Sequence, residues 1–565
     1  MRRRASQLPF KSAETISSAM LSLYVLLLAL AGLGWGAVGD GSSPYLFDIF
    51  DANRPWYTKK GQPGIKIRLS DKTLDEIKDT VFDTAWAELR NVRIAELDVS
   101  KPPFNILLRN FEITDMEGPE QVALEFRPAV DGILFAISDL DVKVKSDLLI
   151  GDPKVSSNAT MTATIKDIRM AFVTTLAKRQ GKMVFNVYEC KSTVRQVNTT
   201  IKTKNFIIDE FIKDQQETID RSVGSAIPGA LCGGIAQAMG TVVSDMITSA
   251  ALVVPLDAVD TGAYGDNAPK QVAAIDNLQS NLVLDNNLMG RLKVTEKYVE
   301  TNHRGEIRYS DSSLRTPFFP RPMWREPEGD KMVYVTASEY VIQSLFYHLS
   351  VRRKLSLSIE EKDLPPQFAT LLTTSCEDDE EEEENNSIRK TPLQELQGTC
   401  LGNIMPEIGR DYPNRMLRLR IVPWGIPAFT IVDGVGKLAI RGRLYGQVTR
   451  LPLSQIRNTA DLESRDWVSI LTGDVALACD VPFELVDKKV TGDVTVTKME
   501  FKIKKRRKLE GMDPEVFESI APILQDVVTD FLRGKMQAGF QFPGNEFATI
   551  TNTELFKGDG YIRVG

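Results

Sequence analysis

A short strand followed at once by a helix with one apolar side occurs twice in this 565-residue chain. In the first copy, residues 65–69 alternate between apolar and polar side chains, which is typical of a strand with one buried face. The segment "SDKTLDE" then supplies cap residues and early acids, which suit the start of a helix. The apolar residues of that helix recur every three or four positions: Leu74, Ile77, Val81, Ala85 and Leu89. This spacing favours a helix packed on a sheet.

The second copy follows a segment with four prolines, residues 316–330, which predicts a stiff extended linker. Residues 332–335 form the predicted strand, and Ser338 and Glu339 form the predicted cap. The helix places Val341, Leu345 and Leu349 on one face, and a return strand follows. A chain this long exceeds one compact core, so we expect at least two domains.

Long alternating segments lie between the two copies. Residues 132–150 and 159–173 each place apolar side chains on one face, as expected for a strongly curved antiparallel sheet. A helix over residues 207–227 follows, and Pro228 is expected to end it before another helix begins. The chain closes in a similar way, with a long strand before residue 506 and a helix starting at Pro514. The two halves therefore repeat in architecture more than in residue identity.

The N-terminus favours a secreted protein. Basic residues precede a 14-residue apolar run over positions 20–33, which is short for a membrane span, so residues 1–39 are predicted to be a cleaved signal peptide. A retained signal anchor is the alternative. Glycosylation sequons at Asn158, Asn198 and Asn385 fit an extracellular location.

The sequence offers little support for catalysis. It contains two histidines, His303 and His348, and lacks the usual serine-hydrolase, zinc-protease, phosphate-loop and C-x-x-C motifs. No regular metal-ligand spacing occurs, and no cofactor is predicted. A net charge of −7 argues against nucleic acid as a partner. We therefore expect a protein that is not an enzyme.

Several segments together resemble a known family. These are "PGIKIRLSDKTLDEI" near the start, two cysteines about forty residues apart, "DKMVYVTASEYVIQSLFYHL" after the linker, and "MPEIGRDYPN" at residues 405–414. Their order is similar to that in the family of bactericidal/permeability-increasing protein, lipopolysaccharide-binding protein and cholesteryl ester transfer protein. The resemblance covers residues 64–565.

The resemblance implies an α+β boomerang of two tubular barrels, each a twisted antiparallel sheet wrapped on a long helix, joined by a central sheet. The corresponding parts are an N-terminal barrel over residues 64–255, central strands and linker over 256–330, and a C-terminal barrel over 331–565. Lipid tails would lie between helix and sheet. The residues expected to contact them are Leu74, Ile77, Val81, Leu89, Ile208, Phe211, Ile212, Ile219, Val341, Leu345, Leu349, Val516, Ile520, Leu524 and Val527.

The cysteines fit the same resemblance. Cys190 and Cys232 match the single disulfide of the family. Cys376 and Cys400 bracket an acidic segment, residues 377–399, that looks like an insertion, and a disulfide would close it at the base. That segment is either a solvated loop or a docking site for a cationic partner or calcium. Cys479 is left over and is expected to be a small buried strand residue.

Two functions remain open. The first is a secreted protein that binds or transfers phospholipid or another acyl lipid. The second is an innate-immune module that binds lipopolysaccharide or a partner protein, with lipid mainly structural. Residues 64–255 contain 23 basic and 26 acidic residues, a net charge of −3. This balance argues against direct attack on anionic bacterial membranes and leaves contact with a membrane or lipopolysaccharide surface as an open alternative.

Overall fold

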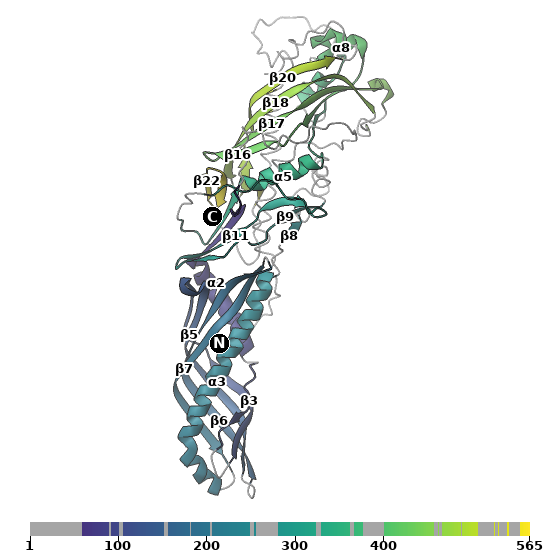
Figure 1. The fold of residues 1–565 in the computed structure, drawn as a ribbon. Coiled ribbons are helices and arrows are strands. Elements are labelled where there is room, and N and C mark those ends of the chain that lie inside the picture. The colour runs from purple at the N-terminus through teal and green to yellow at the C-terminus, as the bar shows by residue number, and fades with distance from the viewer. Residues whose placement is uncertain are drawn as a thin grey trace, which may run out of the picture.

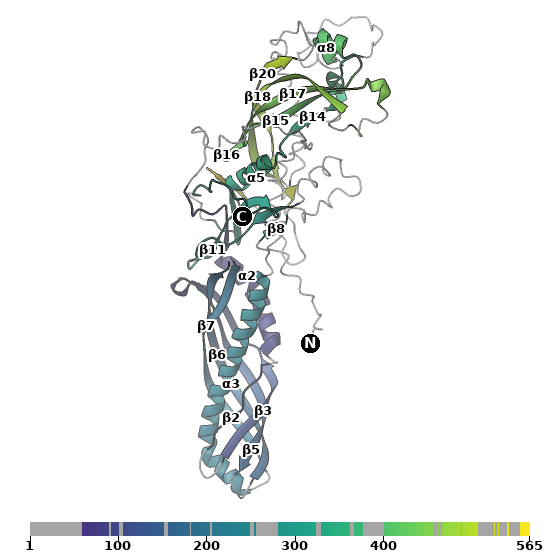
Figure 2. The same ribbon diagram turned by 45° about the vertical axis from the view of Figure 1, so that its right-hand side comes forward.

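We describe the chain from a computed structural model. The structure describes residues 59–89, 92–100, 105–151, 156–180, 182–203, 206–248, 253–255, 281–323, 329–361, 366–376, 400–456, 462, 466–486, 489–506, 525, 529, 540–541 and 554–565. The described parts form an elongated, bent molecule with a curled sheet at each end and smaller sheets between them (Figures 1 and 2).

The N-terminal sheet is antiparallel, with strand order β2-β3-β5-β6-β7 and with β4 paired to β5. Its strands are β2 (Leu97–Asp98), β3 (Asn105–Glu117), β4 (Gln121–Arg127), β5 (Gly132–Gly151), β6 (Ser156–Arg179) and β7 (Lys182–Lys202). A short 3-10 turn, η1 (Pro128–Val130), joins β4 to β5. The three long strands β5, β6 and β7 contain 20, 24 and 21 residues, so their twist accumulates and the sheet curls along its length.

Two helices accompany this sheet, α2 (Asp71–Leu89) and α3 (Phe206–Thr248). The prediction that Pro228 ends a helix is wrong, because α3 runs through it for 43 residues. Proline lacks the N–H that would bond to the carbonyl of residue 224, and its ring crowds that carbonyl. Contacts on both sides of Pro228 hold the helix in place, as described below for Asp220 and Cys232.

The central sheet combines strands from both halves, in the order β10-β11-β1-β13-β23-β22. Their bounds are β10 (Lys293–Val294), β11 (Tyr298–His303), β1 (Ile65–Ser70), β13 (Val333–Ser338), β23 (Tyr561–Val564) and β22 (Leu555–Gly558). The strands that open the two strand–helix units, β1 and β13, pair directly and antiparallel, with Ile67 opposite Val335. This pairing joins the halves through backbone hydrogen bonds.

A small sheet of order β12-β9-β8 lies beside the central sheet, with strands β12 (Glu306–Tyr309), β9 (Leu282–Asp285) and β8 (Val253–Pro255). Helix α5 (Tyr340–Val351) follows β13 and packs between β12 on one side and β16 on the other (Figure 1). Every residue from Tyr340 to Ser350 is buried. The predicted helix with one apolar side is therefore covered on all sides.

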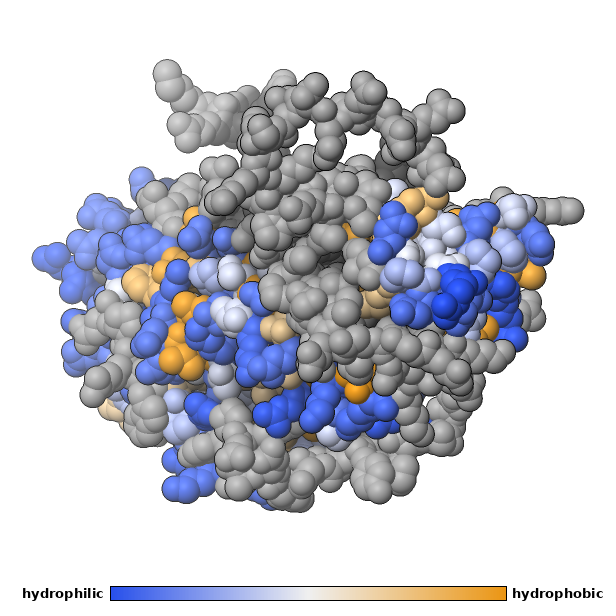
Figure 3. Space-filling model, turned by 90° about the horizontal axis from the view of Figure 1, so that it is seen from above, coloured by the Kyte–Doolittle hydropathy of each residue, from blue (hydrophilic) through white to orange (hydrophobic). Residues whose placement is uncertain are grey.

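The C-terminal sheet has the order β14-β15-β17-β18-β19-β21, with β16 paired to β17 and β20 paired to β18. Its strands are β14 (Leu357–Ile359), β15 (Leu417–Pro423), β16 (Ala428–Val432), β17 (Val435–Thr449), β18 (Trp467–Val486), β19 (Lys489–Gly492), β20 (Thr495–Arg506) and β21 (Phe540–Gln541). Short helical segments flank them: η4 (Pro366–Leu372), α7 (Leu401–Ile404), α8 (Pro406–Asp411) and η5 (Leu453–Gln455). Seen from the α8 end, the described surface mixes hydrophilic residues with smaller hydrophobic patches (Figure 3).

The expected α+β architecture of two curled antiparallel sheets joined by a central sheet is confirmed. Within the described residues, no helix combines the length and the apolar character needed to span a bilayer. The predicted signal segment, residues 1–39, and the predicted helix after Pro514 lie outside the described residues, apart from positions 525 and 529.

Candidate functional site

One face of the curled N-terminal sheet is lined with apolar side chains. Along β5, alternate residues from Leu140 to Ile150 are buried, whereas Lys143, Lys145 and Asp147 on the opposite face are exposed. Strand β6 continues the lining. Its inward residues are Met161, Ala163, Ile165, Ile168, Met170 and Phe172. These strand positions lie outside the predicted site, which consists of helix residues, although their period of two identifies them in the sequence.

Helix α3 faces this surface with a continuous apolar row. The predicted residues Ile208, Ile212 and Ile219 are buried, and Phe211 is half-buried against the same cluster. The row extends beyond the predicted set. Its further members are Val223, Ile227, Leu231 and Ile235. Helix and sheet thus present two apolar surfaces to one interior.

Close approach fixes α3 on β7. A Cβ atom added at Gly224 would lie 2.7 Å from Cγ2 of Val197, so only glycine lets the helix approach this closely. Just before it, Asp220 Oδ1 accepts hydrogen bonds from the backbone N–H of Thr199 at 3.2 Å and from its hydroxyl at 2.6 Å. These polar contacts occupy the strand-facing side of the helix and leave its apolar row to the interior.

A disulfide between Cys190 and Cys232 ties β7 to α3 at a Cα–Cα distance of 5.9 Å. The two cysteines are 42 positions apart in the sequence. In the loop-entropy account, closing a loop of this length stabilises the folded state by about 4 kcal/mol, because it restricts the unfolded chain. Together with the Asp220 contacts, it anchors the helix on both sides of Pro228. The second expected pair, Cys376–Cys400, is also bonded, with Cα atoms 5.2 Å apart. The acidic segment that this pair closes, residues 377–399, lies outside the described residues.

Ser146 is a polar residue on the inward face of β5. Its side chain is 1% exposed, and its hydroxyl has no hydrogen-bond partner among the described residues. It lies between Val144 and Leu148 on the same face, opposite Met161 of β6. An unsatisfied buried hydroxyl costs free energy, so this position is suited to a polar group of a bound molecule.

The remaining predicted residues of the first half divide into two groups. Leu74 is buried, but it packs near the central sheet with Phe126, Leu176 and Val299 instead of joining the α3 cluster. Three further predicted residues belong to α2, and their side chains lie outside the described part: Ile77, Val81 and Leu89. Of the sequons, Asn158 and Asn198 are exposed on β6 and β7, whereas position 385 is not described.

In the second half, the predicted residues Val341, Leu345 and Leu349 are buried in the cluster that fills the base of the C-terminal sheet. Polar residues on the same helix fasten it to its surroundings. Gln343 donates to the carbonyl of Pro427 at 2.8 Å and accepts from the backbone N–H of Phe429 at 2.7 Å. The remaining predicted set is not described. It consists of Val516, Ile520, Leu524 and Val527.

The predicted cap of α5 differs in the structure. The Glu339 side chain makes no capping hydrogen bond. Instead its Oε2 accepts from the backbone N–H of Ile431 at 2.8 Å, and its Oε1 lies 3.3 Å from Nε of Arg321. Burial raises the pKa of this carboxyl, and those two contacts only partly oppose the effect. Glu339 thus connects the start of the helix to β16.

A buried charged cluster lies where α5 meets the small sheet. Glu306 accepts from His348 Nε2 at 3.1 Å, from the backbone N–H of Thr316 at 2.9 Å and from Arg315 at 3.1 Å. Burial opposes ionisation of Glu306, but these partners outweigh it and hold its pKa below the usual range. Arg315 also contacts Asp285, which is fully buried. Each buried carboxylate is therefore paired, as a structural junction requires.

No group of three or more His, Cys, Asp or Glu residues arranged to hold a metal occurs within the described ranges. The unpaired Cys479 is buried in β18, and burial raises the pKa of its thiol to about 12. The prediction of a buried strand residue at this position is confirmed.

Comparison with known proteins gives consistent matches. Residues 276–565 match the LBP / BPI / CETP family, C-terminal domain. Lipopolysaccharide-binding protein of Bos taurus is 22% identical over 379 residues, covering 66% of this chain and 68% of the relative. Bactericidal permeability-increasing protein of Sebastes schlegelii is 18% identical over 522 residues, covering 89% and 94%. A crystal structure of lipopolysaccharide binding protein covers 89% of this chain and 98% of its own, at 16% identity and a TM-score of 0.48.

Proposed function

Because this chain belongs to the LBP/BPI/CETP family, whose members bind lipid or lipopolysaccharide, we propose that it is a secreted protein that binds and transfers phospholipid-like molecules. The acyl chains would lie in the N-terminal unit, between helix α3 and the inward face of β5 and β6. The protein would carry out no catalytic step.

One observation carries this proposal. The inward residues of β5, such as Val142, Val144 and Leu148, form one apolar cluster with the row on α3, although α3 packs mainly on β7 and less on β6. A helix seated along one side of a curled sheet leaves the opposite inward face bordering an apolar interior. An interior of this kind suits hydrocarbon chains that run along the strands.

The energetics are adequate for binding without any charged contact. Burying one methylene contributes about 0.8 kcal/mol, so a long acyl chain could contribute roughly 10 kcal/mol before its ordering cost. Ser146 would meet the ester or headgroup end of such a molecule, because its hydroxyl is a polar group on this inward face without a partner among the described residues.

Charge favours lipid transfer over attack on bacterial membranes. Among the described residues near the far end of β5, Lys143 Nζ lies 2.8 Å from Asp115, and Lys145 is paired across the strands with Glu112. Acidic neighbours thus offset the basic residues of this region. Lipopolysaccharide binding or partner recognition, with lipid mainly structural, is the second candidate, and the named relatives favour it.

The two disulfides support secretion, because bonds of this kind persist in oxidising compartments. The exposed sequon residues Asn158 and Asn198 are accessible for glycosylation in that route. Peptide mapping of the secreted protein would identify the first residue after cleavage and any glycan at these two positions.

The direct test is mass spectrometry of organic extracts from the purified protein, combined with a lipid transfer assay between vesicles. We expect phospholipid to copurify and to move between vesicles. The variant Val144→Trp fills the interior from β5. If that interior holds lipid, the variant should fold with a normal unfolding midpoint and a reduced lipid load.

Lys145→Trp is the matched control, because the neighbouring side chain points to the exposed face of the same strand. It should keep the wild-type lipid load. A solid interior would instead make Val144→Trp unstable by about 1–3 kcal/mol with no lipid in either protein, which would contradict the proposal.

A further inference from the structure

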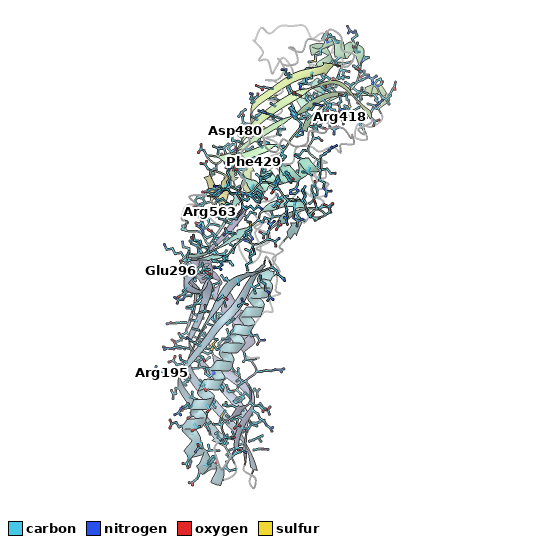
Figure 4. All side chains as sticks on the ribbon, in the orientation of Figure 1. Arg195, Glu296, Arg418, Phe429, Asp480 and Arg563 are labelled. Atoms are coloured by element: carbon cyan, nitrogen blue, oxygen red, sulfur yellow. A yellow bond between two sulfur atoms is a disulfide. The ribbon has the colours of Figure 1, made fainter. Side chains whose placement is uncertain are left out.

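Strand β15 carries arginines on the face opposite the core. Its residues Leu417, Leu419 and Ile421 belong to the buried cluster of the C-terminal unit. Arg418 and Arg420 alternate with them and therefore project from the outer face of the sheet. Figure 4 labels Arg418 on this part of the molecule. Arg418 is buried and Arg420 is half-buried, and burial lowers their pKa values, that of Arg418 to about 10.

Arg418 is held by its neighbours. Its guanidinium carbon lies 4.1 Å from the centre of the Trp467 ring, its Nε donates to Gln447 at 2.8 Å, and its Nη1 lies 3.6 Å from Glu360. The side chain is therefore fixed in place and its charge is only partly compensated.

Arg420 differs from Arg418. Its Nε and Nη2 atoms are buried and have no hydrogen-bond partner among the described residues. These are the two donors on one edge of the guanidinium plane, the pair that binds both oxygens of an oxyanion at once. The same pair is used elsewhere in this chain, where Arg68 donates from Nε at 3.1 Å and from Nη2 at 2.6 Å to Glu300.

The surroundings of Arg420 favour a multiply charged oxyanion over a carboxylate. Across the ladder it faces Ser358 and Tyr445, which are neutral hydrogen-bonding residues. Arg418 lies two positions away on the same face, and Arg443 projects from the neighbouring strand opposite Val422. Trp467, whose ring lies against Arg418, carries a buried indole N–H that also lacks a partner among the described residues.

We propose that the outer face of β15 binds a phosphate group, with the Nε–H and Nη2–H of Arg420 as the bidentate donors and Arg418 as a second positive charge. This site is separate from the apolar interior of the N-terminal unit. The phosphate would belong to a lipid headgroup or to a free phosphate ester. Trp424, directly after β15 and 52% exposed, offers an aromatic ring to the interface of a membrane and favours the headgroup.

The test compares Arg420→Gln and Arg420→Lys with wild type. Binding is measured to phosphatidylcholine vesicles with and without phosphatidic acid, and to glycerol phosphate by calorimetry. Each variant should weaken phosphate-dependent binding about tenfold, equivalent to about 1.4 kcal/mol. The lysine variant keeps the positive charge but lacks the two-donor edge. A loss of affinity in this variant therefore shows that bidentate hydrogen bonding, and not charge alone, holds the phosphate.

Arg441→Gln is the control, because it removes one exposed arginine of β17 farther along the same face. It should change binding less than twofold. An equal loss in Arg441→Gln and Arg420→Gln, or no loss in Arg420→Gln, would overturn the proposal. Binding of glycerol phosphate without a preference for phosphatidic acid vesicles would support the site with a soluble ligand, and a vesicle preference would identify the headgroup.

Wild-type protein provides a measurement that does not depend on how the variants fold. Inorganic phosphate should raise its thermal unfolding midpoint more than chloride at the same ionic strength, because ligands that bind only the folded state stabilise it. No difference between the salts would count against the site. The headgroup alternative rests on the proposed function, yet Arg420→Gln should keep the wild-type amount of copurified acyl lipid, so the two proposals can fail separately.

Discussion

The Nε2 atom of His348 lies 3.1 Å from Oε1 of Glu306, and each side chain is 2% exposed. This contact joins helix α5 to strand β12 at the junction between the two ends of the molecule. Arg315 and the backbone of Thr316 bind the same carboxylate. Glu306 thus accepts hydrogen bonds from three donors in two segments, His348 of α5 and the adjacent residues Arg315 and Thr316.

Replacing Glu306 by alanine should lower the free energy of unfolding by about 3 kcal/mol, because it leaves the buried His348 ring and the buried Thr316 N–H without their acceptor. Urea denaturation would measure the change. Asp311→Ala, which removes the exposed contact with Arg352, should have a much smaller effect. Similar losses in the two variants would contradict the importance of this junction.

The stability should depend on pH through His303. This ring is buried, with Nδ1 donating to the Asn286 carbonyl at 2.9 Å and Nε2 paired with the Thr301 hydroxyl at 2.8 Å. Burial lowers the pKa of His303 to about 4. The unfolded chain, with an ordinary pKa of about 6.5, binds the proton more readily. The contribution of His303 to the free energy of unfolding is therefore fully present above about pH 6.5 and is lost as the pH drops towards 4.

We expect His303 to account for roughly 3 kcal/mol across that window. Urea denaturation at several pH values would measure it, with His303→Gln as the comparison. The variant should lose stability less steeply between pH 6.5 and 4. Glu306 and Asp285, whose pKa values lie below the usual range, titrate at lower pH in both proteins and cancel in the comparison. Parallel pH profiles would refute the assignment to His303.

The thiol of Cys479 should not react in the native protein. Burial in β18 raises its pKa to about 12, so almost no thiolate forms at neutral pH, and the reagent has no access. Ellman's reagent should detect no thiol in native protein and one thiol per chain after denaturation without reductant. Rapid labelling of native protein would show that this strand opens readily.

Two glycines of helix α3 should respond to alanine in opposite ways. Gly224→Ala places a Cβ atom 2.7 Å from Val197 Cγ2, so the helix must move away from β7 and stability should fall. A Cβ atom at Gly229 meets nothing within 4 Å. Gly229→Ala should therefore raise stability by about 1 kcal/mol through helix propensity. Thermal unfolding would compare them, and a neutral Gly224→Ala would contradict the close contact.

Much of the fold was predictable from local patterns. The alternation over residues 132–150 gave β5 almost to its bounds, because a strand with one buried face has a period of two. The strand–helix repeat was also predicted. Pro228 was misjudged because the contacts that hold α3 through it come from Thr199 and Cys190, which are distant in sequence. Local propensity does not include such anchors.

The candidate site was predicted less completely. The apolar row of α3 followed from helical spacing, whereas the surroundings of α5 did not. Its apolar face was visible in the sequence, but burial of Gln343 and His348 depends on Pro427 and Glu306, which only the tertiary structure brings near. Similarly, the net charge of the chain does not reveal the pair Arg418 and Arg420. Strand alternation places both on one face, but only the core contacts of their neighbours show that this face is the outer one.

The hydrogen-bonded pair of β1 and β13 makes the two duplicated halves interdependent. Separating them would strip each opening strand of a neighbour and expose its backbone edge, a surface prone to self-association. We therefore expect that neither half folds independently of the other. A truncation that preserves one complete curled sheet would still leave β1 or β13 with an unpaired edge, so an intact central sheet needs both strand–helix units in one chain.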